Sequence, residues 1–334
     1  MDENKGPSIV ATAWSFTAAS FLFMALRFWA KVSRSEGSLW WDDWILLISW
    51  VLTYATALLN TIMVYALGSG RHIFAVDPRN LGPITLMANI AGTTSILAAQ
   101  LSKTSFAITL LRIAIDPWIR AAVWFSIVTI NLTMTANFMV QWLQCYPSER
   151  YWNPSVPGTC WTPGVQSMIS LVMAAYSGAI DILLSLVPWK IVMSLQMKRA
   201  EKIGVASAMS MGIFAGAAAC IKAAYIPGLA AGDFTFDSAE LLIYSYVEIG
   251  LSIIAASIPA MRVLVRDKIN STRQPSKGTV QSQTLVSRPM TARQRSDLEA
   301  LAPNQIRQKL SFTVEYERDS PPSGRPNNFV EKTL

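Results

Sequence analysis

The sequence has 334 residues, of which 52% are hydrophobic and 15% are charged, and its formal net charge is +7. An ordinary soluble domain is nearer a quarter charged, so this composition argues against a soluble globular protein. The basic residues lie between apolar blocks and in the last part of the chain without interleaved aromatic residues, which argues against nucleic acid as a partner.

Seven apolar blocks follow one another along the chain, each long enough to cross about 30 Å of hydrocarbon at about 1.5 Å per helical residue. We expect transmembrane helices at residues 9–30, 43–67, 83–113, 120–143, 164–192, 203–227 and 239–265. Trp40, Trp41 and Trp44 suit a membrane-interface belt at the start of the second helix. The sequence therefore predicts an all-α membrane protein, a seven-transmembrane helix bundle in a lipid bilayer.

Basic residues gather on one side of the expected bundle. That side has Lys31, Arg34, Arg112, Arg120, Lys190, Lys198, Arg199, Lys202, Arg262, Arg266 and Lys268, whereas the other has Lys5, Arg71, Arg79 and Arg150. The positive-inside rule then places a short N-terminus, residues 1–8, outside or in a lumen, before a membrane domain at residues 9–266. Residues 267–334 are rich in Ser, Thr, Gln, Arg and Pro, which predicts a disordered cytosolic tail that is either solubilising or phosphorylated to bind partners.

Two of the three cysteines flank a loop on the expected outer side. Cys145 and Cys160 bound the segment CYPSERYWNPSVPGTC, where the environment is oxidising, so we predict a disulfide between them, with two unpaired thiols as the alternative. Cys220 lies within the expected sixth helix and is interpreted as a small buried apolar residue.

Four ionisable residues fall within the expected helices: Lys103, Asp181, Lys222 and Glu248. Each costs about 2.5 to 3.5 kcal/mol at the centre of a membrane helix on insertion scales, so each needs a partner or water. Their depths along the helices predict two ion pairs, Lys103 with Asp181 and Lys222 with Glu248. The pairs either fix the register of the helices or belong to a polar cavity.

Other polar residues near these charges favour the cavity, which would bind a lipophilic small molecule. If chemistry occurs there, we expect Asp181 and Glu248 to be its acids or bases in a metal-free isomerisation or cyclisation, although the paired lysines oppose that role. His72 is interpreted as a general base at the mouth or as a structural cap or surface residue. The remaining expected cavity residues are Lys103, Lys222, Gln100, Asn89, Tyr225 and Tyr246, with Arg71 and His72 at the outer mouth.

Common cofactor and metal signatures do not occur in the sequence. There is no cluster of His, Cys and carboxylates with ligand spacing, and no nucleotide-binding or hydrolase motif. Residues 241–261 of the seventh helix hold no lysine for a retinal. We therefore expect no metal and no cofactor.

Several segments, taken together and in order, resemble the fungal rhodopsin-like membrane protein family over about residues 27–266. They are WWDDW (40–44), ALGSGRH (66–72), LSKTSFAITLLRI (101–113), QCYPSERYWN (144–153), DILLSLVPWKIVMSLQM (181–197) and VEIGLSIIAASIPAMRVL (247–264). This family includes satratoxin-cluster type integral membrane proteins and pathogenicity-related receptor-like proteins. The resemblance implies seven helices and an outer N-terminus, with Lys103, Arg112, Asp181 and Glu248 at family-typical positions and Lys222 where the family often has arginine.

The resemblance implies two alternative functions. The chain is either a membrane protein of a specialised (secondary) metabolite pathway that binds or acts on a lipophilic intermediate beside pathway enzymes, or an orphan receptor-like sensor that couples to a G protein. We favour the pathway function because the chain before the first helix is too short for the cysteine-rich extracellular domain of some receptor-like relatives. Either function places the protein in an endomembrane or the plasma membrane.

Overall fold

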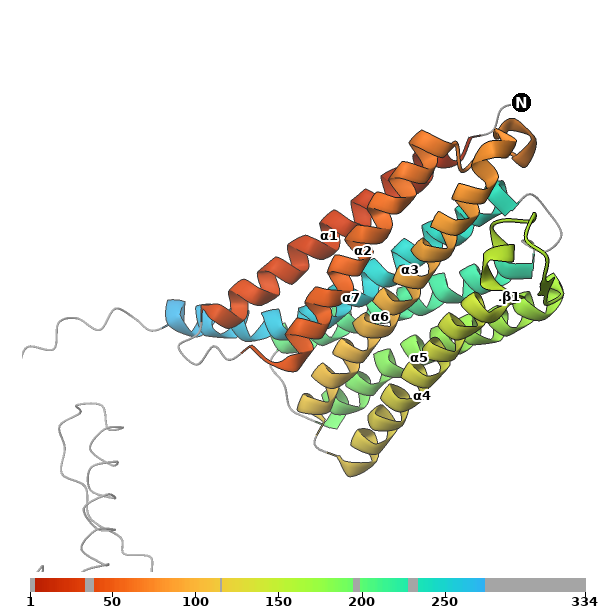
Figure 1. Ribbon diagram of the computed structural model, residues 1–334. Coiled ribbons are helices and arrows are strands. Elements are labelled where there is room, and N and C mark those ends of the chain that lie inside the picture. Colours follow the sequence, from red (N-terminus) through yellow and green to blue (C-terminus); the bar gives the residue numbers. More distant parts are fainter. Residues whose placement is uncertain (1–3, 34–38, 115, 195–198, 228–233, 274–334) are drawn as a thin grey trace, which may run out of the picture. The chain divides into compact units, whose positions relative to one another are not determined.

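The protein is a bundle of seven α-helices (Figure 1). The computed structural model describes residues 4–33, 39–114, 116–194, 199–227 and 234–273. All seven helices belong to one unit, residues 1–274. Their bounds are α1 Gly6–Val32, α2 Trp41–Leu67, α3 Pro78–Ile113, α4 Pro117–Leu143, α5 Pro163–Ser194, α6 Arg199–Tyr225 and α7 Phe234–Arg273. The expected all-α seven-helix bundle is confirmed.

Between α4 and α5 lies a small antiparallel hairpin, with strands β1 Cys145–Tyr146 and β2 Thr159–Cys160. The 3₁₀-helix η2 (Ser148–Tyr151) lies between these strands, and η1 (Ile73–Ala75) lies between α2 and α3. We call the end of the bundle with this hairpin the disulfide end. The opposite end, where Asp42 and Asp43 lie in the first turn of α2, is the aspartate end.

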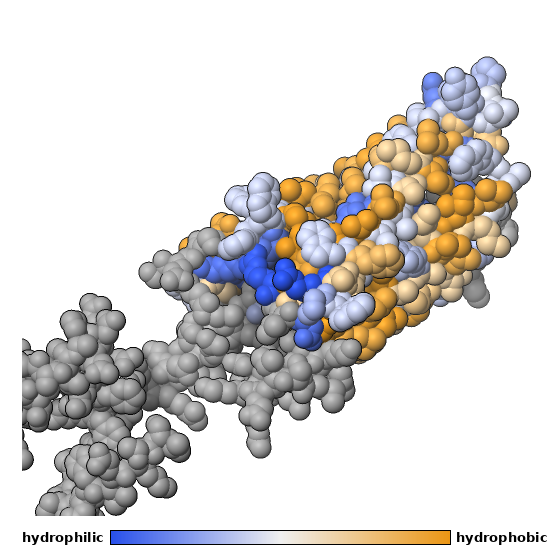
Figure 2. Space-filling view, turned by 90° about the horizontal axis from the view of Figure 1, so that it is seen from below, coloured by the Kyte–Doolittle hydropathy of each residue, from blue (hydrophilic) through white to orange (hydrophobic). Residues whose placement is uncertain are grey.

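All seven helices are long and apolar enough to cross a membrane. Large apolar side chains face outward along the bundle, and Leu22, Phe125 and Leu132 are each more than half exposed. Figure 2 shows this hydrophobic surface along the length of one face, with hydrophilic side chains gathered toward the aspartate end. Such a surface is stable in hydrocarbon and unfavourable in water, so the chain is an integral multi-pass membrane protein.

Prolines in the first turn and a side-chain N-cap set several helix boundaries. Pro78 and Pro117 open α3 and α4, where the missing N–H of proline is of no consequence, and the Asp77 side chain accepts a hydrogen bond from Arg79 N at 2.9 Å. Pro83, expected to begin the third helix, lies inside α3 because this cap starts the helix earlier. At the other end of the domain α7 continues to Arg273, past the expected boundary at residue 266. The expected cytosolic tail beyond it lies outside the described residues.

Small residues bring α5 and α6 close together. A Cβ added at Gly216 would lie 2.7 Å from Ile182 Cγ1 and 3.1 Å from the Gly178 carbonyl oxygen, so the two backbones nearly touch. This small-residue packing is typical of membrane helices, which have no hydrophobic drive to associate in lipid. The prediction that Cys220 is buried was wrong. Cys220 is exposed, because α6 buries a stripe of alanines that includes Ala215, Ala219 and Ala223, and Cys220 lies beside that stripe.

The helix α7 is central to the packing, since it contacts α1, α2, α3 and α6. Phe16 of α1 packs against Gly250, where an added Cβ would lie 2.8 Å from the ring. Helix α7 is thus placed to reach polar groups of several other helices, including Asn60, Lys103 and Lys222.

Candidate functional site

Four charged side chains form a continuous chain through the middle of the bundle. Lys103 of α3 lies 2.8 Å from an Asp181 carboxylate oxygen on α5 and 2.6 Å from Glu248 Oε1 on α7. Lys222 of α6 donates to the second oxygen of Glu248. Both predicted ion pairs are confirmed. The Lys103–Glu248 contact that joins them was not predicted, because depth along a helix says nothing about the face on which a residue lies.

Three of the four side chains in this network are shielded from solvent. The side chains of Lys103 and Glu248 are each 1% exposed, and that of Asp181 is 6% exposed. Ser177 of α5 contributes a hydroxyl that contacts Lys103 and donates to Glu248 Oε1 at 3.2 Å. Two lysines face two carboxylates, so the formal charges balance, as buried ionic groups require. The network ties α3, α5, α6 and α7 together.

A cavity of about 530 Å³ lies between this network and the disulfide end. Lys222, Glu248 and Ser177 line its inner end, while Arg150, Tyr151 and Trp161 line it near the hairpin. Along α7 the lining runs from Thr235 to Ile249, which at about 1.5 Å per residue corresponds to roughly 20 Å. This volume lies within the range of about 300 to 1,000 Å³ for pockets that hold drug-sized molecules.

The walls of the cavity differ in polarity. The α5 wall is mostly polar, with Gln166, Ser167, Ser170, Ala174 and Ser177. The α7 wall is mixed, with Thr235, Ser238, Ser245 and Glu248 beside Leu241, Leu242 and Ile249. The α3 wall is mostly small and apolar, with Ile84, Ala88, Gly92, Ile96 and Ala99. Such a cavity can place polar groups of a guest along one side and apolar groups along the other.

The hairpin at the mouth is held by the Cys145–Cys160 disulfide, which confirms the predicted pairing. The same two residues are opposite each other in the β1–β2 pair. Arg150 Nη1 donates to the Val156 carbonyl at 2.6 Å, a hydrogen bond between two residues of the loop that joins β1 to β2. Burial raises the pKa of the Tyr151 phenol and its hydrogen bond to Gln144 opposes that effect, so Tyr151 is a neutral polar group at the mouth.

Several side chains expected in the cavity lie elsewhere in the described structure. The Tyr246 hydroxyl accepts from Asn60 Nδ2 at 2.6 Å, and its ring packs with Ala13 and Ala57 between α1, α2 and α7. Gln100 Nε2 donates to Asn131 Oδ1 at 2.8 Å and so joins α3 to α4. Sequence reasoning placed each of these residues on the correct helix and at a suitable depth. It did not give the face of the helix on which the side chain lies, and that face is turned away from the cavity.

Five more expected residues, Lys103 of the charged network among them, are also outside the cavity lining. Asn89 is buried on α3, where its backbone carbonyl accepts from Gln141 Nε2 at 2.9 Å. Tyr225 is 42% exposed and stacks on Tyr244. Arg71 is exposed, and His72 stacks on Phe236 with ring centroids 4.3 Å apart. Of the two interpretations of His72, this contact fits a structural cap better than a general base in the cavity.

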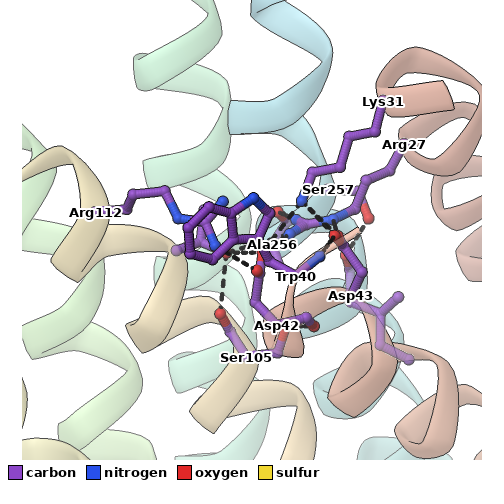
Figure 3. Close-up of polar contacts among 11 residues, drawn as sticks. Arg27, Lys31, Trp40, Asp42, Asp43, Ser105, Arg112, Ala256 and Ser257 are labelled. Carbon is purple, nitrogen blue, oxygen red and sulfur yellow. Dashed lines mark hydrogen bonds and ion pairs between the residues drawn. The ribbon is translucent and has the colours of Figure 1, made fainter. Parts of the chain in front are cut away.

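A second buried charge cluster lies at the aspartate end. Arg27 of α1 is fully buried, contacts Asp42, lies 2.8 Å from Asp43 Oδ1 and donates to the Ala256 carbonyl of α7. Arg27 and Lys31 approach Asp42 and Asp43 from one side, and Arg112 approaches from the other (Figure 3). Lys31 Nζ is 2.6 Å from Asp43 Oδ2, and Arg112 Nη2 is 2.7 Å from Asp42 Oδ1.

Local structure positions these two aspartates. Asp43 accepts from the Trp40 backbone N–H at 3.1 Å and caps the first turn of α2, where carboxylates also suit the helix dipole. Ser105 of α3 donates to the Asp42 carbonyl at 2.7 Å, and the Arg112 guanidinium lies 4.4 Å from the centre of the Trp40 ring. Sequence reasoning assigned the tryptophans to a membrane belt and missed the ion pairs. The available signal was the spacing of Arg27 and Lys31, four residues apart on one helix face, next to an Asp–Asp pair.

Within the described ranges, no group of three or more His, Cys, Asp or Glu side chains is placed to hold a metal ion. The polar side chains that line the cavity carry cations, hydroxyls, amides and the Glu248 carboxylate.

Comparison with known proteins identifies relatives of the chain. The fungal rhodopsin domain family matches residues 26–267. A SAT4 family membrane protein of Emericella nidulans (strain FGSC A4) is 27% identical over 210 residues, which are 60% of this chain and 50% of that protein. The chain thus spans about half the length of this curated relative. No solved structure matches the chain.

Proposed function

The chain belongs to the fungal rhodopsin domain family, and from this premise we propose that its cavity binds a lipophilic small molecule. The observation that carries the proposal is a cavity of about 530 Å³ that ends inside the bundle at the Lys222–Glu248 pair. An interior of this size among membrane helices, with mostly small side chains on one wall and a few polar groups on the others, is typical of a small-molecule site.

The geometry favours binding over acid–base chemistry. Glu248 Oε1 accepts from Lys103 and Ser177, and Oε2 accepts from Lys222, so its acceptor positions are engaged by cationic and hydroxyl donors. A carboxylate held in this way must give up one of these partners to take a proton from a guest, and it carries no proton to donate. Asp181 is in contact with Lys103 and is absent from the cavity lining of the described residues. Catalysis by Asp181 and Glu248 stays a prediction that this arrangement does not favour.

In the proposal, the disulfide end faces the outer or lumenal side. A disulfide at Cys145–Cys160 needs an oxidising compartment, and Lys31, Arg112 and Arg120 lie at the other end, where the positive-inside rule expects basic residues. The guest then enters from the outer or lumenal side, or from the adjacent lipid.

The guest in this proposal is an intermediate or product of a specialised-metabolite pathway. Support comes from the resemblance to satratoxin-cluster type membrane proteins and from a relative named as a SAT4 family membrane protein. In that setting the protein sequesters or hands on a lipophilic compound beside pathway enzymes in the same membrane.

A receptor-like role is a second candidate, and one feature favours it. Helix α7 carries Glu248 at the inner end of the cavity and, about 12 Å further along the helix, the Ala256 carbonyl that accepts from Arg27. One rigid element thus touches both buried charge clusters. A guest that displaced Glu248 would act on the helix that also holds the aspartate cluster, which is the kind of bistable link that a receptor needs.

The binding proposal is tested with the full chain purified from a fungal host that makes it. Compounds are extracted from wild type, from Ala88→Phe, which places a phenyl ring in the cavity, and from Ile90→Phe, a matched change on the exposed side of the same helix. We expect mass spectrometry to find a compound enriched with wild type and Ile90→Phe and depleted at least tenfold with Ala88→Phe. Equal recovery from all three proteins would refute binding in this cavity.

Metabolite profiling separates the two candidate roles. A strain without the protein and a strain with Ala88→Phe are compared with wild type for their metabolites and for the transcripts of the pathway genes. A pathway role predicts the same accumulated compound in both altered strains with unchanged transcripts. Transcripts that fall in both strains would instead support the receptor-like role.

A further inference from the structure

We infer that the ligand of the cavity is an uncharged, elongated molecule that carries a hydrogen-bond acceptor, such as a carbonyl or hydroxyl oxygen, at the end that meets Lys222. This inference rests on the proposed binding function and specifies the chemistry of its ligand. Four features of the cavity support it: the donors at its inner end, the charge balance there, its length and the polarity of its walls.

Lys222 supplies the donor. Its ammonium group has three N–H bonds, and Glu248 Oε2 is the acceptor that the described structure gives it. The Lys222 side chain is 18% exposed, whereas that of Glu248 is 1% exposed, so the lysine is the member of the pair that a guest can reach. A guest oxygen can therefore accept a hydrogen bond from Lys222 without breaking the ion pair.

The charge balance selects against an ionised guest. Lys103 and Lys222 already match Asp181 and Glu248 one for one inside the bundle. A carboxylate or an amine at the inner end would add an uncompensated charge where desolvation penalises it most. Arg150, the other cation in the lining, lies near the hairpin, where its Nη1 is held by Val156. A neutral acceptor satisfies the Lys222 donor and leaves the balance intact.

The walls define the rest of the molecule. The lining extends over roughly 20 Å of α7, from Thr235 to Ile249, so a guest that fills it is longer than it is wide. Thr235 Oγ1 is buried at the outer end without a hydrogen-bond partner among the described residues. The α5 side is lined by Gln166 and three serines, the α3 side by mostly small apolar residues, and α7 presents hydroxyls as well as leucines to the cavity. The guest therefore carries oxygens along one edge and at its outer end, and hydrocarbon along the opposite edge.

The test uses three fluorescent probes with one carbon skeleton: cis-parinaric acid, its methyl ester and the corresponding amine. Binding to the full chain in phosphatidylcholine nanodiscs is measured by fluorescence, with the signal of empty nanodiscs subtracted. Wild type is compared with Lys222→Met, Glu248→Gln and Lys5→Met. Lys5→Met is the matched control, since Lys5 also pairs with a glutamate, Glu240, but lies outside the cavity lining.

We expect wild type and Lys5→Met to bind the ester saturably and at least tenfold more tightly than the acid or the amine. Lys222→Met removes the donor and leaves one excess negative charge, so ester affinity falls at least tenfold and the amine becomes the preferred probe. Glu248→Gln leaves one excess positive charge, so the acid becomes the preferred probe. If a variant does not fold, the order in which the wild-type protein binds the ester, the acid and the amine tests the inference by itself.

Two results would overturn the inference while leaving cavity binding intact. One is saturable binding of the acid or the amine to wild type that equals or exceeds that of the ester. The other is a folded Lys222→Met protein with an unchanged order of affinities. Saturable binding of none of the probes, together with no compound recovered from purified wild type, would instead refute the proposed binding function and this inference with it.

Discussion

Replacing Lys103 by methionine is the most informative single change, because this lysine holds both buried carboxylates. Its Nζ lies 2.8 Å from Asp181 and 2.6 Å from Glu248. In the Lys103→Met protein Glu248 keeps Lys222 and Ser177, whereas Asp181 loses the ion-pair partner that the described structure gives it. Removal of one partner of a buried pair typically lowers the free energy of unfolding by about 3 to 5 kcal/mol.

This loss in the free energy of unfolding corresponds to a measurable fall in the melting temperature. At about 2 to 4 °C per kcal/mol for a domain of this size, Lys103→Met should lower the melting temperature in nanodiscs by about 10 °C. Adding Asp181→Asn removes the orphaned charge and restores neutrality, so the double variant should recover most of that loss. Lys5→Met, which breaks a pair whose side chains are 30% and 27% exposed, should cost less than about 1 kcal/mol.

The comparison between the single and double variants is decisive. If Lys103→Met with Asp181→Asn unfolds at the same temperature as Lys103→Met alone, the loss comes from packing of the lysine stem rather than from an uncompensated carboxylate. The charge-balance argument for the network would then be wrong.

Three further predictions concern other parts of the bundle. Changing both Cys145 and Cys160 to serine opens a loop with a sequence separation of 15 residues, so the free energy of unfolding should fall by about 3 kcal/mol, and ester-probe binding should weaken because the hairpin lines the cavity. This is measured by thermal unfolding and probe titration; unchanged values in both assays would contradict it. Gly216→Ala should lower the free energy of unfolding by about 1 to 3 kcal/mol, since its Cβ would lie 2.7 Å from Ile182, whereas Gly164→Ala, which meets nothing within 4 Å, should not destabilise. Equal melting temperatures for these two glycine variants would refute the close α5–α6 packing. Tyr246→Phe should lower the free energy of unfolding by about 1 kcal/mol through the loss of its bond to Asn60 while probe affinity stays unchanged; a loss of affinity would place Tyr246 in the site after all.

Much of the fold was predictable because each membrane-spanning helix requires a long apolar segment, which is visible directly in the sequence. The seven apolar blocks gave the seven helices to within a few residues in most cases, and the exceptions have local causes. The Asp77–Pro78 cap starts α3 before Pro83, and helical structure carries α7 beyond residue 266. The Cys145–Cys160 pairing was predictable because an outer loop bounded by two cysteines has few alternatives.

The site was predictable only in part, because sequence gives depth but not direction around a helix axis. Lys103, Asp181, Lys222 and Glu248 were found as ionisable residues in apolar surroundings, and their pairing followed from depth. Tyr246 and Gln100 have suitable depths, yet they face α2 and α4 respectively. Arg27 was missed as a buried charge because its partners, Asp42 and Asp43, lie across a loop at the start of the next helix.

The measurement that tests cavity binding most directly is an experimental structure, by electron cryo-microscopy, of the full chain purified from a fungal host and placed in nanodiscs. The account predicts elongated density that begins near Thr235 and ends within hydrogen-bonding distance of Lys222 Nζ, and that is lost in Ala88→Phe. A cavity closed by its own side chains, or the same density retained in Ala88→Phe, would contradict the account.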